Sequence, residues 1–77
     1  MSWITVDDKH KRKYDRRFFS CEEAHERKYI IDTILEVFPS FDRTKVERAV
    51  DQCCRRIKAS RPCKEFLDCV RESIGTM

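Results

Sequence analysis

The residues best suited to chemistry are five cysteines and one of two histidines. The cysteines are Cys21, Cys53, Cys54, Cys63 and Cys69. Cys21 and His25 stand four residues apart, so on a helix they would share one face. With two further thiolates they would supply the four nitrogen and sulfur ligands of a tetrahedral zinc ion. The set predicted for such a zinc site is Cys21, His25, Cys54 and Cys69.

Two other interpretations of the cysteines stay open. Cys53 and Cys63 fall within the apolar stripes of predicted helices, where a reduced cysteine packs as a small hydrophobic residue. We expect packing to be the main role, because the chain has no C-x-x-C pair and an odd number of cysteines fits a closed disulfide framework poorly. Cys21 is the candidate for a redox-active thiol, since the positive end of a helix favours a thiolate.

Motifs for catalysis are absent from the sequence. It contains no glycine-rich loop, no nucleophile elbow and no pair of carboxylates outside charged helix faces. His10 lies in a basic run and His25 lies on a mixed helix face. We therefore predict that the protein is not an enzyme and takes no cofactor, apart from the zinc considered above.

Basic residues form two blocks, 1–19 and 40–61, on either side of a more acidic segment. The candidates for nucleic-acid contact are Lys9, Lys11, Arg12, Lys13, Arg16 and Arg17 in the first block and Arg48, Arg55 and Arg56 in the second. Tyr14 lies among the first set and could stack on a base. Solvated faces or attraction between segments of one fold are the alternative explanation. A nucleic-acid-binding regulator is thus the second functional hypothesis, ahead of a zinc or redox site.

The densest run of large apolar residues is Tyr29–Phe41. This run belongs to a longer predicted helix. Ser20 and Glu23 fit a capping box at the start of that helix, and Pro39 must end it because proline lacks an amide hydrogen. The resulting helix is apolar over so much of its circumference that it needs neighbours on two sides. It is the predicted centre of the fold.

More apolar residues are present than the core of a small helical bundle needs. The surplus that we assign to a partner-binding patch is Trp3, Tyr29, Ile30 and Val37. Such residues are often covered in a dimer or by another protein. The predicted function is therefore a small non-catalytic interaction module that binds a protein partner or itself. The alternative is that the N-terminal segment covers the patch within one chain.

The predicted fold class is all-α, a small three-helix bundle. The helices are expected at about 21–38, 43–59 and 62–74. Asp42 is placed to cap the second helix. The helices would form a domain of residues 20–77, preceded by a basic N-terminal arm of residues 1–19. This arm is expected to be irregular or a short strand, with one or two helical turns, or a hairpin of residues 2–6 with 13–19, as alternatives.

Length and composition set further bounds. A chain of 77 residues forms one domain with a small core. Charged residues make up 40%, with one glycine and two prolines, which favours helices. No stretch is long enough to cross a membrane, and the N-terminus lacks the apolar segment of a signal peptide. The expected compartment is the cytoplasm, where cysteines would be mostly reduced.

Overall fold

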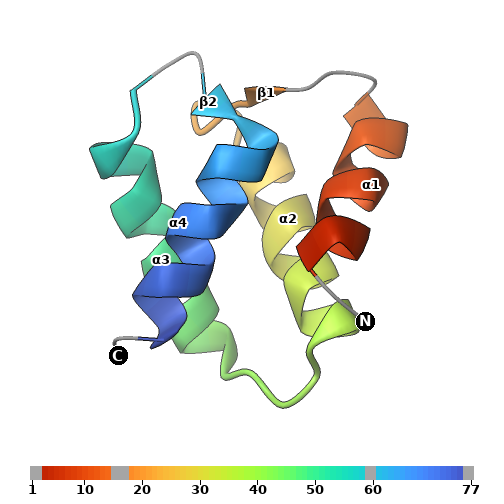
Figure 1. Ribbon diagram of the computed structural model, residues 1–77, viewed down its shortest axis with the longest axis vertical. Helices are drawn as coiled ribbons and strands as arrows, with labels where there is room; N and C mark the ends of the chain where they lie inside the picture. Colours follow the sequence, from red (N-terminus) through yellow and green to blue (C-terminus); the bar gives the residue numbers. More distant parts are fainter. Residues whose placement is uncertain (1–2, 15–17, 59–60, 76–77) are drawn as a thin grey trace.

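Four helices form most of the computed structural model, which describes residues 3–14, 18–58 and 61–75 (Figure 1). In chain order the elements are α1 (Trp3–Tyr14), β1 (Phe18–Phe19), α2 (Ala24–Val37), α3 (Arg43–Arg56), β2 (Arg61–Pro62) and α4 (Cys63–Gly75). Helix α2 packs against α1 and α3, and α4 packs against α3 and α1. The predicted all-α class is confirmed. No helix within the described ranges is both long and apolar enough to span a bilayer.

Helices α3 and α4 follow the apolar pattern of the sequence. The Asp42 carboxylate accepts a hydrogen bond from the Thr44 amide at 3.0 Å, which is the predicted N-cap. The buried stripe of α3 is Val46, Ala49, Val50 and Cys53. That stripe and the inner face of α4 supply much of the core, and α3 ends at Arg56, three residues before the predicted end.

Helix α2 begins at Ala24, three residues after the predicted start, and the predicted capping box is not formed. The Ser20 amide instead donates to the Glu26 carboxylate at 2.9 Å. Glu23 is the N-cap residue, in an extended conformation, and its side chain makes no capping hydrogen bond. The bond to Glu26 holds the preceding residues along the side of the helix, so they cannot join its first turn.

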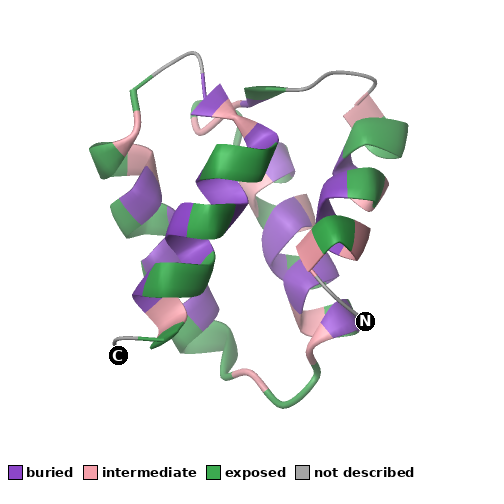
Figure 2. Cartoon of the chain, viewed as in Figure 1, coloured by how far each residue is buried: buried purple, intermediate pink, exposed green. Residues whose placement is uncertain are grey.

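The N-terminal segment differs from the predicted irregular arm, because Trp3–Tyr14 is helical. Its inward positions are Trp3, Val6, Asp7, His10 and Tyr14, spaced as one face of a helix. Buried faces of α1, α2 and α4 meet in the middle of the molecule (Figure 2). The hairpin alternative is wrong: β1 pairs antiparallel with β2, with Phe19 opposite Arg61.

A buried hydrogen bond between a histidine and a glutamate fastens α1 to α2. The His10 Nε2 atom lies 2.9 Å from the Glu26 carboxylate, and both side chains are 0% exposed. The same carboxylate oxygen accepts a hydrogen bond from the Ser20 amide. The His10 ring also lies 5.7 Å from the ring of Phe19. One carboxylate thus joins the first helix, the strand region and the central helix.

Two disulfide bonds join the other elements. Cys21 is bonded to Cys54 and Cys53 to Cys69, with Cα separations of 5.9 and 6.0 Å. The neighbours Cys53 and Cys54 point different ways from α3, one into the core toward α4 and one toward the segment before α2. The prediction that these four cysteines are reduced packing residues is therefore wrong, whereas Cys63 is a free, buried thiol as predicted.

Loss of the buried His10–Glu26 contact should cost more stability than loss of an exposed ion pair. We expect His10→Ala to lower the free energy of unfolding by about 3 kcal/mol, because Glu26 is left buried without this partner. The control is Lys9→Ala, which removes a pair with Glu36 whose side chains are 37% and 67% exposed. That change should cost under about 1 kcal/mol. Urea denaturation measures both, and equal effects would contradict the assignment.

Each disulfide should stabilise the folded protein by restricting the unfolded chain within the loop that it closes. They span 33 and 16 residues, which corresponds to about 3 to 4 kcal/mol each in the chain-entropy treatment. We expect the Cys21→Ser/Cys54→Ser double variant to lose about that much unfolding free energy. Fragmentation mass spectrometry of the unreduced protein tests the pairing directly. A Cys21–Cys53 or Cys54–Cys69 linkage would refute it.

Candidate functional site

The predicted partner-binding patch is not a surface. Ile30 is 0% exposed and Val37 is 5% exposed, so both belong to the core and their assignment to a partner interface is wrong. The physical reason is α1, which covers this side of α2. Tyr29 is partly buried, and its hydroxyl donates to the Lys9 carbonyl at 3.3 Å. Trp3 is also partly buried, with its ring centroid 5.0 Å from that of Phe38.

The predicted zinc site is not formed. Cys21 and Cys54 are bonded to each other and Cys69 is bonded elsewhere, so these sulfurs are not thiolate ligands. His25 is exposed, with its ring 6.3 Å from that of Tyr14. Within residues 3–14, 18–58 and 61–75, no three His, Cys, Asp or Glu side chains are grouped so as to hold a metal ion.

The predicted nucleic-acid contacts are divided between two sides of the molecule. Helices α1 and α3 lie at opposite sides in Figure 1, with α2 and α4 between them. Three of the predicted residues on α1 are engaged, since Lys9 pairs with Glu36, Lys11 with Asp7, and Lys13 lies 5.9 Å from the Tyr29 ring centroid.

The other predicted basic residues do not complete a single surface. Arg12 on α1 and Arg48 and Arg56 on α3 are exposed. Arg55 pairs with Asp51 on its own helix at 2.9 Å. Arg16 and Arg17 lie outside the described residues. The structure therefore does not bring the two predicted sets together.

A groove between α1 and α4 is the most distinctive surface feature. Its lining is Trp3, Ile4, Asp7, Asp8 and Lys11 from α1 and Lys64, Leu67, Asp68 and Arg71 from α4. The spacings of three and four place each set on one helix face. The volume is about 450 Å³. We call this feature the α1–α4 groove.

The α1–α4 groove has an apolar centre and a charged rim. Ile4 is 70% exposed, and the only other large hydrophobic side chain so exposed in the described part of the chain is Phe18, at 49%. Trp3 stands beside Ile4, and Leu67 lies on the floor at 2% exposure. Asp7 is bound to Lys11 at 3.2 Å along one wall. The groove thus combines exposed apolar side chains with charged ones.

A buried thiol lies directly beneath this groove. Cys63, at the start of α4, is 1% exposed and lies beside Asp7. Burial raises the pKa of the Cys63 thiol well above its ordinary value of 9.0, and the Asp7 carboxylate adds to the rise through its charge and a hydrogen bond. Such a thiol is protonated and shielded, so it is unsuited to nucleophilic or redox chemistry.

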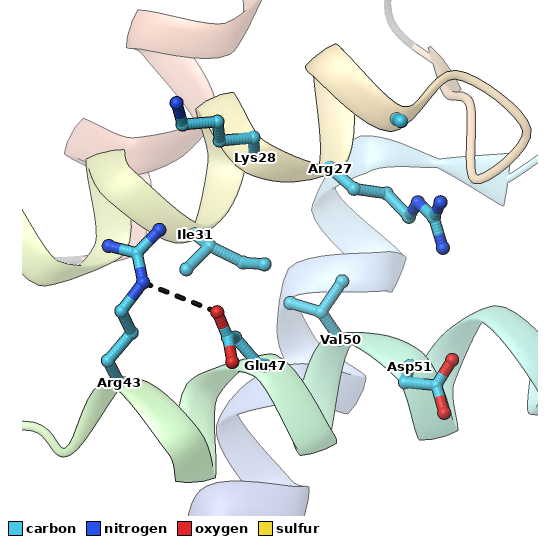
Figure 3. A pocket seen from close by; sticks show the side chains of 8 residues that line it. Arg27, Lys28, Ile31, Arg43, Glu47, Val50 and Asp51 are labelled. Atoms are coloured by element: carbon cyan, nitrogen blue, oxygen red, sulfur yellow. Dashed lines mark hydrogen bonds and ion pairs between the residues drawn. The ribbon is translucent and has the colours of Figure 1, made fainter.

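A second hollow lies between α2 and α3 and has a volume of about 380 Å³. Figure 3 shows Arg27 and Arg43 toward opposite ends, with Ile31 and Val50 between them. Arg43 is engaged by Asp32 at 2.9 Å and Glu47 at 3.3 Å, and its hydrogen bond to Asp32 raises the pKa of the guanidinium. Because Ile31 and Val50 are themselves buried, this hollow offers little apolar surface.

Sequence reasoning missed most of the α1–α4 groove. Of its lining, only Trp3 was predicted to bind a partner, and Lys11 was assigned to nucleic acid. Ile4 belongs to an apolar run, Trp3-Ile4-Thr5-Val6, that was visible in the sequence. The Lys64, Leu67 and Arg71 positions could not be linked to that run without knowing that α1 is helical and packs on α4.

The buried thiol should make stability depend on alkaline pH. The folded chain retains a proton that the unfolded chain releases above pH 9, so this contribution is complete below that pH and is lost as pH rises. Above that pH, we expect the free energy of unfolding of the wild type to fall more steeply than that of Cys63→Ser. The difference in slope should be about 1.4 kcal/mol per pH unit. Denaturation from pH 8 to 10.5 measures the difference. Parallel profiles would contradict it.

The comparisons with known proteins give no further guide to this groove. The chain matches no protein family, no curated protein and no solved structure. The distinguishing feature of the groove is its geometry: an exposed isoleucine stands on a helix that is held from its inner side by buried polar contacts. The strongest candidate site is the α1–α4 groove.

Proposed function

We propose that this protein is a non-catalytic interaction module that binds a protein partner through the α1–α4 groove. The observation that carries the proposal is the 70% exposure of Ile4 beside Trp3 in a groove with Leu67 on its floor. Burying an isoleucine side chain contributes about 1.5 to 3 kcal/mol, which is available only when something covers it. A partner would supply that cover.

The arrangement of the groove resembles the anatomy of protein interfaces. Binding energy is concentrated in a few apolar or aromatic side chains near the centre, and tryptophan is enriched among them. Charged groups lie at the rim, where they remain hydrated and set orientation. Here Trp3 and Ile4 are central, with Asp8 and Lys64 among the exposed charged side chains.

The burial of the reactive side chains supports a role without catalysis. His10 is 0% exposed and is held by Glu26, while Cys63 is 1% exposed. Neither reaches solvent, where a substrate would have to meet it. The ionisable pair that does line the groove, Asp7 with Lys11, is already joined by an ion pair.

We also infer that the protein works in an oxidising compartment rather than in the cytoplasm that the sequence suggested. Two disulfides join elements that are distant in sequence, Cys21 to Cys54 and Cys53 to Cys69. Disulfides persist in oxidising compartments and are rare where thiol reductants are abundant. A small core also gains more from such cross-links than a large one does.

The groove can be tested with a displayed library of amphipathic helical peptides. We expect the wild-type protein to select peptides whose affinity falls about 10- to 100-fold for Ile4→Asp, since the buried isoleucine is lost. The matched control is Phe18→Asp, which changes the other exposed large hydrophobic side chain, in β1. Peptides that bind all three proteins equally, or a selection that yields no binders to a wild-type protein that is itself monomeric, would refute the proposal. Calorimetry gives the affinities.

A further inference from the structure

We propose that the partner of the α1–α4 groove is a second copy of the same chain. Two copies would pack groove to groove about a two-fold axis that runs along the groove. Such an axis places α1 of each copy over α4 of the other, and the same surface serves both copies. This inference rests on the proposed interaction function and names its partner.

The charges of the groove favour a partner with the same charges. Its six ionisable residues are three acids, Asp7, Asp8 and Asp68, and three bases, Lys11, Lys64 and Arg71. The whole chain carries a net charge of +3, which would oppose self-association, but this face is balanced. A strongly acidic or basic partner would leave half of these groups facing like charge.

Most of these charges form no ion pair with another residue that the structure describes. Asp7 and Lys11 are joined to each other at 3.2 Å. Within the described ranges, the remaining two acids and two bases form no ion pair. They are Asp8, Asp68, Lys64 and Arg71. Two unpaired acids and two unpaired bases on one face can pair with their counterparts in a second copy.

The register of α1 against α4 identifies the pairs. The two helices run antiparallel (Figure 1), and Asp7 lies beside Cys63 at the start of α4. Asp8 and Lys64 are each one residue further along oppositely directed helices, so they lie within about 3 Å of the same level along the groove. Ile4 lies one turn before Asp8 on α1, and Leu67 lies one turn after Lys64 on α4. Because the helices are antiparallel, Ile4 and Leu67 lie at about the same level as each other.

A two-fold axis along the groove leaves the position of each residue along the groove unchanged and places α1 of one copy over α4 of the other. The Asp8 carboxylate of each copy would then face the Lys64 ammonium of the other. Ile4 of each copy would enter the other's groove over Leu67. Two apolar contacts at the centre would thus be accompanied by two symmetry-related ion pairs at the rim.

The size of the surface sets the expected strength. A stable interface buries about 800 Å² and 20 to 30 residues on each side. Nine residues line this groove. The dimer should therefore be concentration-dependent, with a Kd in the micromolar range or weaker, and its ion pairs should make it weaker at high salt.

A charge-exchange experiment tests this geometry. In a dimer of the Asp8→Lys variant, a lysine would face a lysine at both symmetry-related contacts. In a dimer of the Lys64→Asp variant, an aspartate would face an aspartate at both contacts. Each variant alone should dimerise at least about tenfold more weakly than wild type. An equal mixture of the two should recover the dimer, because each of the two contacts in the heterodimer places a lysine opposite an aspartate. A folding defect cannot produce such recovery.

Sedimentation equilibrium from about 10 μM to 1 mM at low salt gives the dissociation constants. Ile4→Asp should be monomeric throughout that range. A monomeric wild type, a dimer unchanged in Ile4→Asp, or a mixture that fails to recover would each overturn this inference. A monomeric wild type that still selects peptides dependent on Ile4 would overturn it while leaving the proposed function intact. A monomer that selects no such peptides would overturn both.

Discussion

The contact on which the rest of the structure depends is the buried pair of His10 and Glu26. Both side chains are 0% exposed, so polar contacts that water cannot supply must come from within the fold. The Glu26 carboxylate also binds the Ser20 amide, which fixes where α2 begins. The orientation of α1 follows from this pair, since His10 can reach Glu26 only if one face of α1 is turned inward. Ile4, about 120° round the helix from His10, is thereby turned to solvent at the edge of that face.

A second set of constraints holds the α3 side of the same end of the bundle, where β2 pairs with β1. Arg61 is 6% exposed, and its guanidinium donates to the Ile57 and Cys54 carbonyls at 2.6 and 3.3 Å. These groups lie at the end of α3, where backbone carbonyls lack helical partners. Its third contact is Glu22, at 3.4 Å, next to the disulfide-bonded Cys21. A core this small cannot hold every loop by apolar packing, so polar capping and disulfides supply the remaining order.

The sequence was informative wherever one face of a helix is uniformly apolar. Helix α3 was predicted because Val46, Ala49, Val50 and Cys53 repeat at helical spacing, and Asp42 stands where a cap is needed. These are local signals, which need no knowledge of the rest of the fold.

Helix α1 could not be predicted by the same reasoning. Two of its inward positions, Asp7 and His10, are polar, and a search for apolar periodicity reads them as surface residues. Glu26, the partner of His10, lies 16 positions further along the sequence, and Cys63, the partner of Asp7, lies 56 positions further along. No local pattern therefore connects these residues. The cysteine pairing has the same limitation, because spacing alone does not distinguish thiolate ligands from disulfide partners. The groove depends on both of these long-range features.

Helix α1 also departs from the usual polarity of a surface helix at three positions. It buries His10 and most of Asp7 while it leaves Ile4 70% exposed. Burying polar groups costs free energy unless every contact is made, and an exposed isoleucine adds nothing to the stability of the fold. A sequence selected for stability alone would place these residues the other way round. Natural proteins break such local rules mainly at functional sites. This departure therefore supports a binding role for the outer face of α1, with the buried polar contacts serving to hold that face in position.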